Sequence, residues 1–313
     1  MKFIAVRAVQ LVVVLVAATF FVYSLTFLAD GDDAVVDSIL QIEAGSETRR
    51  AEIEEGLNID DPLPVRYVKW AGAALTGDFG QSYVRGRPVW DLMQEPLVRT
   101  LALVVYAQLL ALLLAVPAGI VAAWRANTWI DRGVSTTSIG LLAIPNYVLA
   151  IVLVFLFAST FKVFPGIVDS DLSPLDLRSY FLPSVALALP QVAVYMRLLR
   201  TDMIATLQED YIGMAKAKGL KTSSILFRHA LRPSSLSLVT SVGLSTGALI
   251  GGTVIIEQIF AMPGMGTLVV RAIFQDDVFV IQAVVAVIAF AFVVINFIVD
   301  LLYAALDPRI RSA

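Results

Sequence analysis

Six long apolar runs, separated by polar segments, dominate the pattern of hydrophobic and polar residues along this chain. Because a helix needs about 20 mainly apolar residues to cross a bilayer, these runs predict six membrane-spanning helices. We place them at roughly residues 4–28, 99–124, 134–161, 181–203, 235–257 and 279–303. The first run is longer than the apolar core of a signal peptide, and no clear cleavage site follows it, so we interpret it as an uncleaved anchor.

One polar interruption differs from the other loops because it is basic and helix-forming. Between Glu209 and Arg232 the chain carries seven formal charges. At about 3 kcal/mol for each charge at a bilayer centre, burying this segment in lipid would cost roughly 20 kcal/mol. The segment therefore lies in water. Gly219 can end one short helix and the side chain of Thr222 or Ser223 can cap a second, which predicts a helix-turn-helix suited to docking another protein.

The composition favours an all-α membrane protein over a soluble one. Hydrophobic residues make up 58% of the chain, the mean hydropathy is +0.81, and only 16% of the residues are charged. One soluble core could not bury this much apolar surface. The chain has no cysteine, so disulfides and thiolate metal sites are excluded.

Charge is distributed unevenly and predicts the orientation. Residues 30–95 contain fourteen acidic and six basic residues, whereas basic residues fill the loops on the other side of the predicted spans. Since cytoplasmic loops retain Lys and Arg, we expect both termini to be cytoplasmic. We predict an anchor helix at 1–29, an extracytoplasmic segment at 30–98, a five-helix core at 99–308 with a cytoplasmic loop at 204–234, and a tail at 309–313.

The extracytoplasmic segment allows two interpretations. Its residues 48–56 favour a charged, exposed helix, but a disordered acidic loop over 30–56 fits the sequence equally well. Within the spans, Pro117, Pro145 and Pro190 are expected to kink helices around a cavity.

Several motifs along the chain resemble those of ABC-importer permeases of the oligopeptide/dipeptide/nickel family. The cytoplasmic loop carries Asp210-Tyr211, Ala215-x-Ala217-x-Gly219-Leu220 and His229-x-Leu231-Arg232. Matching stretches elsewhere are 61–65, 77–82, 144–147, 257–266 and 307–309. The chain is most similar to the first of the two permease subunits in such importers. It departs from the general importer motif in the placement of Ala215 and Ala217 and in the arginine between Leu231 and Pro233, as is typical of the peptide branch.

The resemblance implies the type I importer fold in a bacterial cytoplasmic membrane. It further implies a second homologous permease subunit, two cytoplasmic ABC ATPase subunits, an extracytoplasmic substrate-binding protein and a peptide substrate, with no nucleic acid. ATP and Mg would be used by the ATPases, and this non-catalytic chain would bind no cofactor. Peptide import would then be driven by movement of the cytoplasmic loop.

Three groups of site residues follow from the resemblance and from helix geometry. The residues predicted to couple to the ATPases are Glu209, Asp210, Tyr211, Ala215, Ala217, Lys218, Gly219, Leu220, Arg228, His229, Leu231 and Arg232. The resemblance assigns Glu257, Phe260, Pro263, Gly264 and Gly266 to an outer gate or a contact with the binding protein, although a helix cap and a tight turn explain them equally well. Gly243, Gly247 and Gly251 recur every fourth residue and predict close helix packing.

Other classes of protein fit the sequence less well. An ion-coupled secondary transporter usually needs ionisable groups at mid-membrane, whereas the span centres here carry mainly amides such as Gln108, Gln191 and Asn296. No constellation typical of an intramembrane hydrolase occurs, and the glycines before Lys221 lack the order of a phosphate-binding loop. His229, the only histidine, has no partner ligands nearby in sequence, so no metal site is expected. Nickel or another non-peptide solute remains an alternative cargo.

Overall fold

Helices make up nearly all of the regular structure, in two units that each have their own core. The computed structural model describes residues 2–43, 47–169, 173 and 176–306. One unit comprises Met1–Ile4, Leu101–Met262 and Ile295–Ala313, and the other comprises Ala5–Thr100 and Pro263–Val294. We call them the helical-core unit and the outer unit, and describe each by itself.

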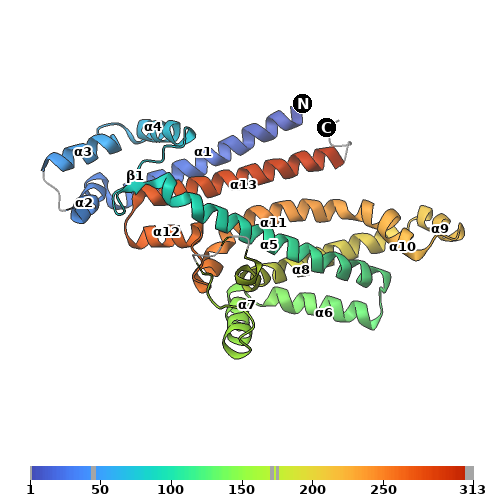
Figure 1. Ribbon diagram of the computed structural model, residues 1–313. Helices are drawn as coiled ribbons and strands as arrows, with labels where there is room; N and C mark the ends of the chain where they lie inside the picture. Colours follow the sequence, from blue (N-terminus) through green and yellow to red (C-terminus); the bar gives the residue numbers. More distant parts are fainter. Residues whose placement is uncertain (1, 44–46, 170–172, 174–175, 307–313) are drawn as a thin grey trace. The chain divides into compact units, whose positions relative to one another are not determined.

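From Ala5 onward the long helix α1 (Lys2–Asp30) belongs to the outer unit, which continues with three shorter helices (Figure 1). These are α2 (Asp32–Glu43), α3 (Glu47–Leu57) and α4 (Leu63–Leu75). The helix α3 confirms the charged helix predicted at 48–56. The disordered acidic loop, its alternative, is wrong for the described residues of this stretch, because apolar positions of α2 and α3, including Val36 and Ile53, are fully buried with Tyr23 and Tyr67.

A short hairpin of β1 (Gln81–Ser82) and β2 (Arg87–Pro88) leads into α5 (Val89–Trp124). The outer unit also contains α12 (Met265–Phe274) and the first half of α13 (Val278–Leu306). Its second cluster of buried residues joins Val89 and Met93 of α5 to Leu268 of α12 and Val284 of α13. An ion pair between Arg66 and Asp32 at 3.0 Å links α4 to the start of α2.

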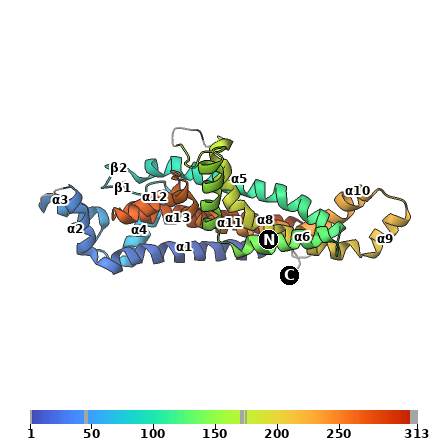
Figure 2. The same ribbon diagram turned by 90° about the horizontal axis from the view of Figure 1, so that it is seen from below.

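The helical-core unit is built around α5, α8 (Leu177–Leu207) and α11 (Leu231–Ile259), which run side by side (Figures 1 and 2). Small residues allow this close packing: Ala111 and Ala115 of α5 are buried against Ala188 of α8. At Gly119 an added Cβ would lie 3.2 Å from the Leu199 side chain. A buried polar network also crosses the three helices, because Gln108 Nε2 donates to the Tyr195 hydroxyl at 2.7 Å, and Tyr195 hydrogen-bonds Ser245.

Among the residues that the structure describes, five helices are long and apolar enough to cross a membrane, and a bent pair would make a sixth. The bent pair is α6 (Trp129–Ala143) and α7 (Asn146–Leu153), the latter continued by the π-helix η1 (Val154–Thr160). The two directions differ by 99°. The span predicted at 134–161 is thus present only as a bent pair, and the bend lies at Pro145, where a kink was expected. Ile144 is extended (φ −97°, ψ 122°), as expected before a proline, so the helix cannot run through Pro145. Pro117 and Pro190 lie inside continuous helices.

Candidate functional site

The predicted docking segment projects from one end of α8 and α11 in the helical-core unit (Figures 1 and 2). It contains α9 (Asp210–Ala217), α10 (Thr222–Ser224) and the π-helix η2 (Ile225–Ala230), which continues into α11. The first of the two expected short helices is confirmed as α9, whereas the second is the beginning of one long helix, Thr222–Ile259. The second helix is preceded by Lys221, which is extended and makes no side-chain cap, so the predicted capping by Thr222 or Ser223 is wrong.

Gly219 ends α9 in the manner predicted. Its φ is +71°, in the left-handed region that favours glycine. The Gly219 N–H donates to the Lys216 carbonyl at 2.9 Å, and the Leu220 N–H donates to the Ala215 carbonyl at 3.2 Å. These two bonds form a Schellman motif, which satisfies helix-end carbonyls that would otherwise lack donors. The chain direction after α9 therefore depends on this one residue.

A small apolar core fixes α9 against the following helix. Ile212 and Ala215 of α9 are buried with Ile225 of η2, and Leu207 at the end of α8 packs against them. The Tyr211 hydroxyl adds a contact across the turn by donating to the carbonyl of His229 at 3.5 Å. The segment is thus a packed helix-turn-helix connected directly to two long helices, so a force on α9 reaches α8 and α11.

The segment also exposes several large apolar side chains. The exposed fractions are 61% for Met214, 60% for Phe227 and 40% for Tyr211, and Leu220 is also exposed. Sequence reasoning had selected Tyr211 and Leu220 but missed Met214 and Phe227. The signal available was a large apolar residue in an otherwise charged loop. We refer to Tyr211, Met214, Leu220 and Phe227 as the apolar docking face.

Charges surround the apolar docking face. Glu209 and Asp210 lie at the start of α9, and Lys216 lies in its last turn, so both ends complement the helix dipole. Lys218, Arg228 and Arg232 are exposed. Partial burial, assisted by Glu209, raises the pKa of the Tyr211 phenol. Of the remaining predicted residues, Ala217 is exposed, His229 and Leu231 are partly buried, and Ala215 belongs to the core beneath.

The residues assigned to an outer gate fall in both units. Glu257 and Phe260 are fully buried at the end of α11, where the Met262 N–H donates to the Glu257 carbonyl at 2.8 Å. Pro263, Gly264 and Gly266 form the start of α12 in the outer unit, with Gly264 preceding its first residue. The helix break predicted after Glu257 is present.

The glycines of α11 differ from one another in their surroundings. A Cβ added at Gly243 would lie 2.0 Å from Cγ2 of Val299, so this position packs closely on α13. Gly247 is buried. Gly251 is exposed, and a Cβ added there would meet nothing within 4 Å. The predicted close helix packing is therefore present within the chain at Gly243, whereas no described residue packs closely against Gly251.

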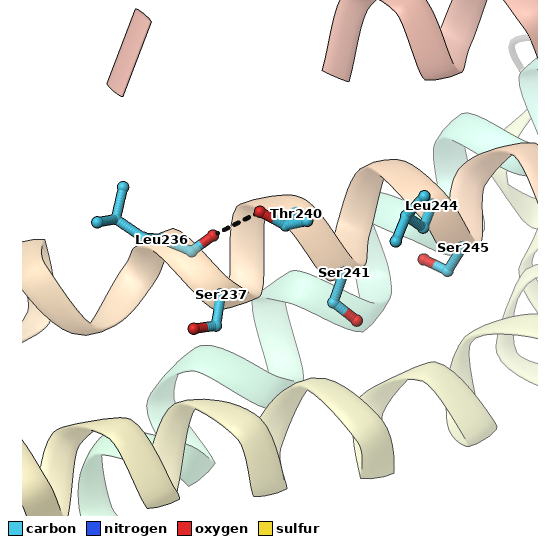
Figure 3. Close-up of a pocket in the computed structure, with 6 residues that line it drawn as sticks. All are labelled: Leu236, Ser237, Thr240, Ser241, Leu244 and Ser245. Carbon is cyan, nitrogen blue, oxygen red and sulfur yellow. Dashed lines mark hydrogen bonds between the residues drawn. The ribbon is translucent and has the colours of Figure 1, made fainter. Parts of the chain in front are cut away.

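An open pocket of about 620 Å³ lies along α11 and was not anticipated (Figure 3). Hydroxyl groups from Ser237, Thr240, Ser241 and Ser245 line it, together with Leu236 and Leu244. Ser237 and Ser241 point to the same side of the helix (Figure 3). Thr240 Oγ1 instead donates to the Leu236 carbonyl at 3.1 Å. A four-residue spacing of serines inside a membrane span was the sequence signal for this polar face.

Within the part of the chain that the structure describes, no group of three or more His, Asp or Glu side chains could hold a metal ion.

Comparison with known proteins gives consistent matches along the chain. Residues 115–312 match the model of the family described as binding-protein-dependent transport system inner membrane component. The chain is 36% identical to a probable peptide ABC transporter permease protein, y4tP, of Sinorhizobium fredii, over 97% of each chain. It is 39% identical to the oligopeptide transport system permease protein AppB of Bacillus subtilis, covering 85% of this chain and 86% of that protein. It is 31% identical to the dipeptide transport system permease protein DppB of Alkalihalophilus pseudofirmus, covering 97% and 98%.

Proposed function

Because the chain belongs to the family of binding-protein-dependent transport system inner membrane components, we propose that it forms one half of the membrane channel of an ATP-driven peptide importer. It is a multi-pass permease subunit, not an enzyme. The observation that carries the proposal is the helix-turn-helix at 210–230, with a packed underside and an exposed apolar docking face, joined without a flexible linker to α8 and α11.

The apolar docking face receives the cytoplasmic ATPases. The exposed residues Tyr211, Met214 and Phe227, in a segment otherwise rich in charges, have the composition of a protein interface, in which aromatic residues and Met are enriched at the centre and charges form the rim. Two ATPase subunits would close on ATP and Mg and move α9. The ATPases in each nucleotide state can shift the equilibrium between the outward-facing and inward-facing channel only as far as their affinities for these two conformations differ.

The remaining partners follow from the same assembly. A second, homologous permease subunit completes the channel, and an extracytoplasmic binding protein delivers the solute to the side where Glu257, Phe260, Pro263, Gly264 and Gly266 lie. Both termini and the 204–234 loop are cytoplasmic in this proposal, as the basic loops indicate. The location is a bacterial cytoplasmic membrane.

A peptide is the proposed cargo because the relatives described above are named as peptide, oligopeptide and dipeptide permeases. The open hydroxyl-lined pocket on α11 suits a solute rich in amide groups, which both donate and accept hydrogen bonds. Nickel is less well supported, because the described residues offer no cluster of metal ligands.

The test is reconstitution of the whole importer in lipid vesicles with ATP inside. We expect uptake of a radiolabelled tripeptide, trialanine, to require ATP, the binding protein and this chain. Replacing both Met214 and Phe227 with Glu should release the ATPases from the purified complex without removing the chain from the membrane. ATPases that remain bound to that variant would contradict the assignment of the docking face.

A further inference from the structure

An ion pair between α6 and α8 lies at the end of the helical-core unit that carries the docking segment. Arg200 of α8 donates from Nη2 to Asp131 Oδ2 at 2.7 Å, and its Nε donates to Oδ1 of the same carboxylate. Side-chain exposure is 4% for Asp131 and 25% for Arg200. This two-pronged geometry fixes orientation as well as distance, which a single contact between point charges does not.

The Asp131 carboxylate joins more than two elements. It also accepts the backbone N–H of Asn127 at 2.9 Å, in the turn where α5 gives way to α6. Asn127 has a φ of +65°, a conformation that few residues other than glycine adopt readily. Ser135, one turn further along α6, lies 3.5 Å from the other carboxylate oxygen. One carboxylate therefore connects the α5–α6 turn, the first turns of α6 and the body of α8.

The position of Arg200 along α8 gives this connection a mechanical consequence. Arg200 lies about two helical turns before Leu207, where α8 ends and the turn to α9 begins. The helix α8 is continuous over this stretch, and α6 packs along it. Since a helix transmits displacement along its length, movement imposed on α9 reaches Arg200 before it reaches the polar network at Tyr195.

We propose that Asp131 and Arg200 are positioning residues that make the ends of α6 and α8 move as one body when the ATPases move α9. This inference rests on the proposed function, because it assumes that α9 receives the ATPases. Without the pair, α8 could follow α9 while α6 and the α5–α6 turn stayed behind. ATP would then be hydrolysed with less solute transported.

The first test compares three variants of Arg200 and its neighbour in the reconstituted importer. R200A removes the pair, and R200K keeps the charge but cannot form the two-pronged contact. R197A removes an exposed arginine one turn away on the same helix, which makes no ion pair with any residue that the structure describes. Trialanine uptake and ATP hydrolysis are measured together. We expect R200A to lower the uptake per ATP by about fivefold or more, the lower end of usual coupling between sites. R200K should fall in between and R197A should match the unaltered chain.

The second test does not depend on whether R200A folds. The chain has no cysteine, so Trp129→Cys and Arg197→Cys give one unique pair of spin labels, one on each helix. Trp129 is 81% exposed, so the label is accommodated. The distance between the labels should be the same without nucleotide and with the vanadate-trapped nucleotide. A change of more than about 2 Å, the size of helix shifts at moving interfaces, would overturn the proposal, as would an unchanged uptake per ATP in R200A.

The two proposals fail in different ways. If the purified chain bound no ATPases, the proposed function itself would be wrong. If ATPases bound and drove uptake while the label distance changed, only the role of Asp131 and Arg200 would be lost.

Discussion

At the scale of single residues, the docking segment depends on backbone conformation more than on side-chain chemistry. Gly219 has a positive φ, and no neighbouring atom lies within 4 Å of a Cβ added there. There is therefore room for a side chain at this position. The restriction is conformational, since the left-handed region costs a residue with a Cβ about 1–2 kcal/mol.

Replacing Gly219 with Val should therefore uncouple the importer. A β-branched residue strongly disfavours the left-handed conformation, so α9 would end differently and Leu220 would leave its place on the docking face. We expect ATP-driven uptake to fall about tenfold or more, an effect of about 1.4 kcal/mol or more, with normal insertion into the membrane. Uptake and membrane content are measured on the same vesicles.

The matched control is Gly219→Asn, because Asn enters the left-handed region far more readily than Val. Uptake by this variant should stay within about threefold of the unaltered chain, a loss of well under 1 kcal/mol. An Asn variant as defective as the Val variant would contradict the conformational explanation.

A second single residue, Asp277 of the outer unit, is expected to make stability depend on pH. It is buried, accepts a hydrogen bond from the Ser82 hydroxyl at 2.5 Å, and accepts the Val280 N–H at the start of α13. Burial raises the pKa of its carboxyl, although Ser82, the Val280 N–H and Arg85 oppose the shift. The folded state thus favours the protonated form more than the unfolded chain does.

The sign of the effect follows from this shift. The free energy of unfolding is highest below the ordinary aspartate pKa of about 4, and it decreases as the pH rises through the raised pKa of the folded state. Asp277→Asn keeps a good helix cap and removes the titration. We expect denaturant unfolding of the purified protein in detergent to favour the Asn variant progressively more between pH 4 and pH 8. An identical pH dependence of the two proteins would rule out this contribution.

At the scale of elements, the glycines of α11 differ in how closely the rest of the chain packs against them. Gly243 packs on Val299, whereas Gly251 is exposed. Because overpacking costs about 1–3 kcal/mol, Gly243→Val should reduce the yield of monodisperse protein and lower its melting temperature. Gly251→Val on the same helix should leave both unchanged for the isolated chain. Equal effects of the two substitutions would show that the packing at Val299 does not limit stability.

The elements also show what the sequence could predict. Hydropathy is summed over about 20 residues, so it located the long helices. Gly219 located the end of α9, because the φ angle that a residue favours is a local property. Local patterns did not predict how far α6 and α7 would turn at Ile144, since a proline inside an apolar run is compatible with either a kink or a complete break. Asp131 and Arg200 were missed because they are 69 residues apart, and their pairing depends on how two helices pack.

At the scale of the whole molecule, the boundaries of the two units differ from those of the segments predicted from the sequence. The outer unit joins residues 5–100 to residues 263–294 of the predicted core, because α12 and the start of α13 pack with the earlier segment. A segment that is continuous in sequence, such as 30–98, therefore does not fold as a domain of its own: its cores include Val278 and Leu268. Deleting it would expose the start of α13.

The orientation of the chain is the remaining whole-molecule prediction, and the absence of cysteine makes it directly measurable. Ser223 in the basic loop and Asn58 after α3 are on opposite sides of the membrane if the spans alternate as proposed. Asn58 lies outside the candidate spans, and Ser223 is exposed at the first turn of the helix Thr222–Ile259. In intact cells, a membrane-impermeant maleimide should label Asn58→Cys and spare Ser223→Cys. After the cells are opened, both should react. The free-energy cost of moving the charged loop across lipid prevents it from exchanging between the two sides, so labelling reports one fixed orientation. Labelling of Ser223→Cys in intact cells would therefore place the docking face outside the cell, where no cytoplasmic ATPase could reach it.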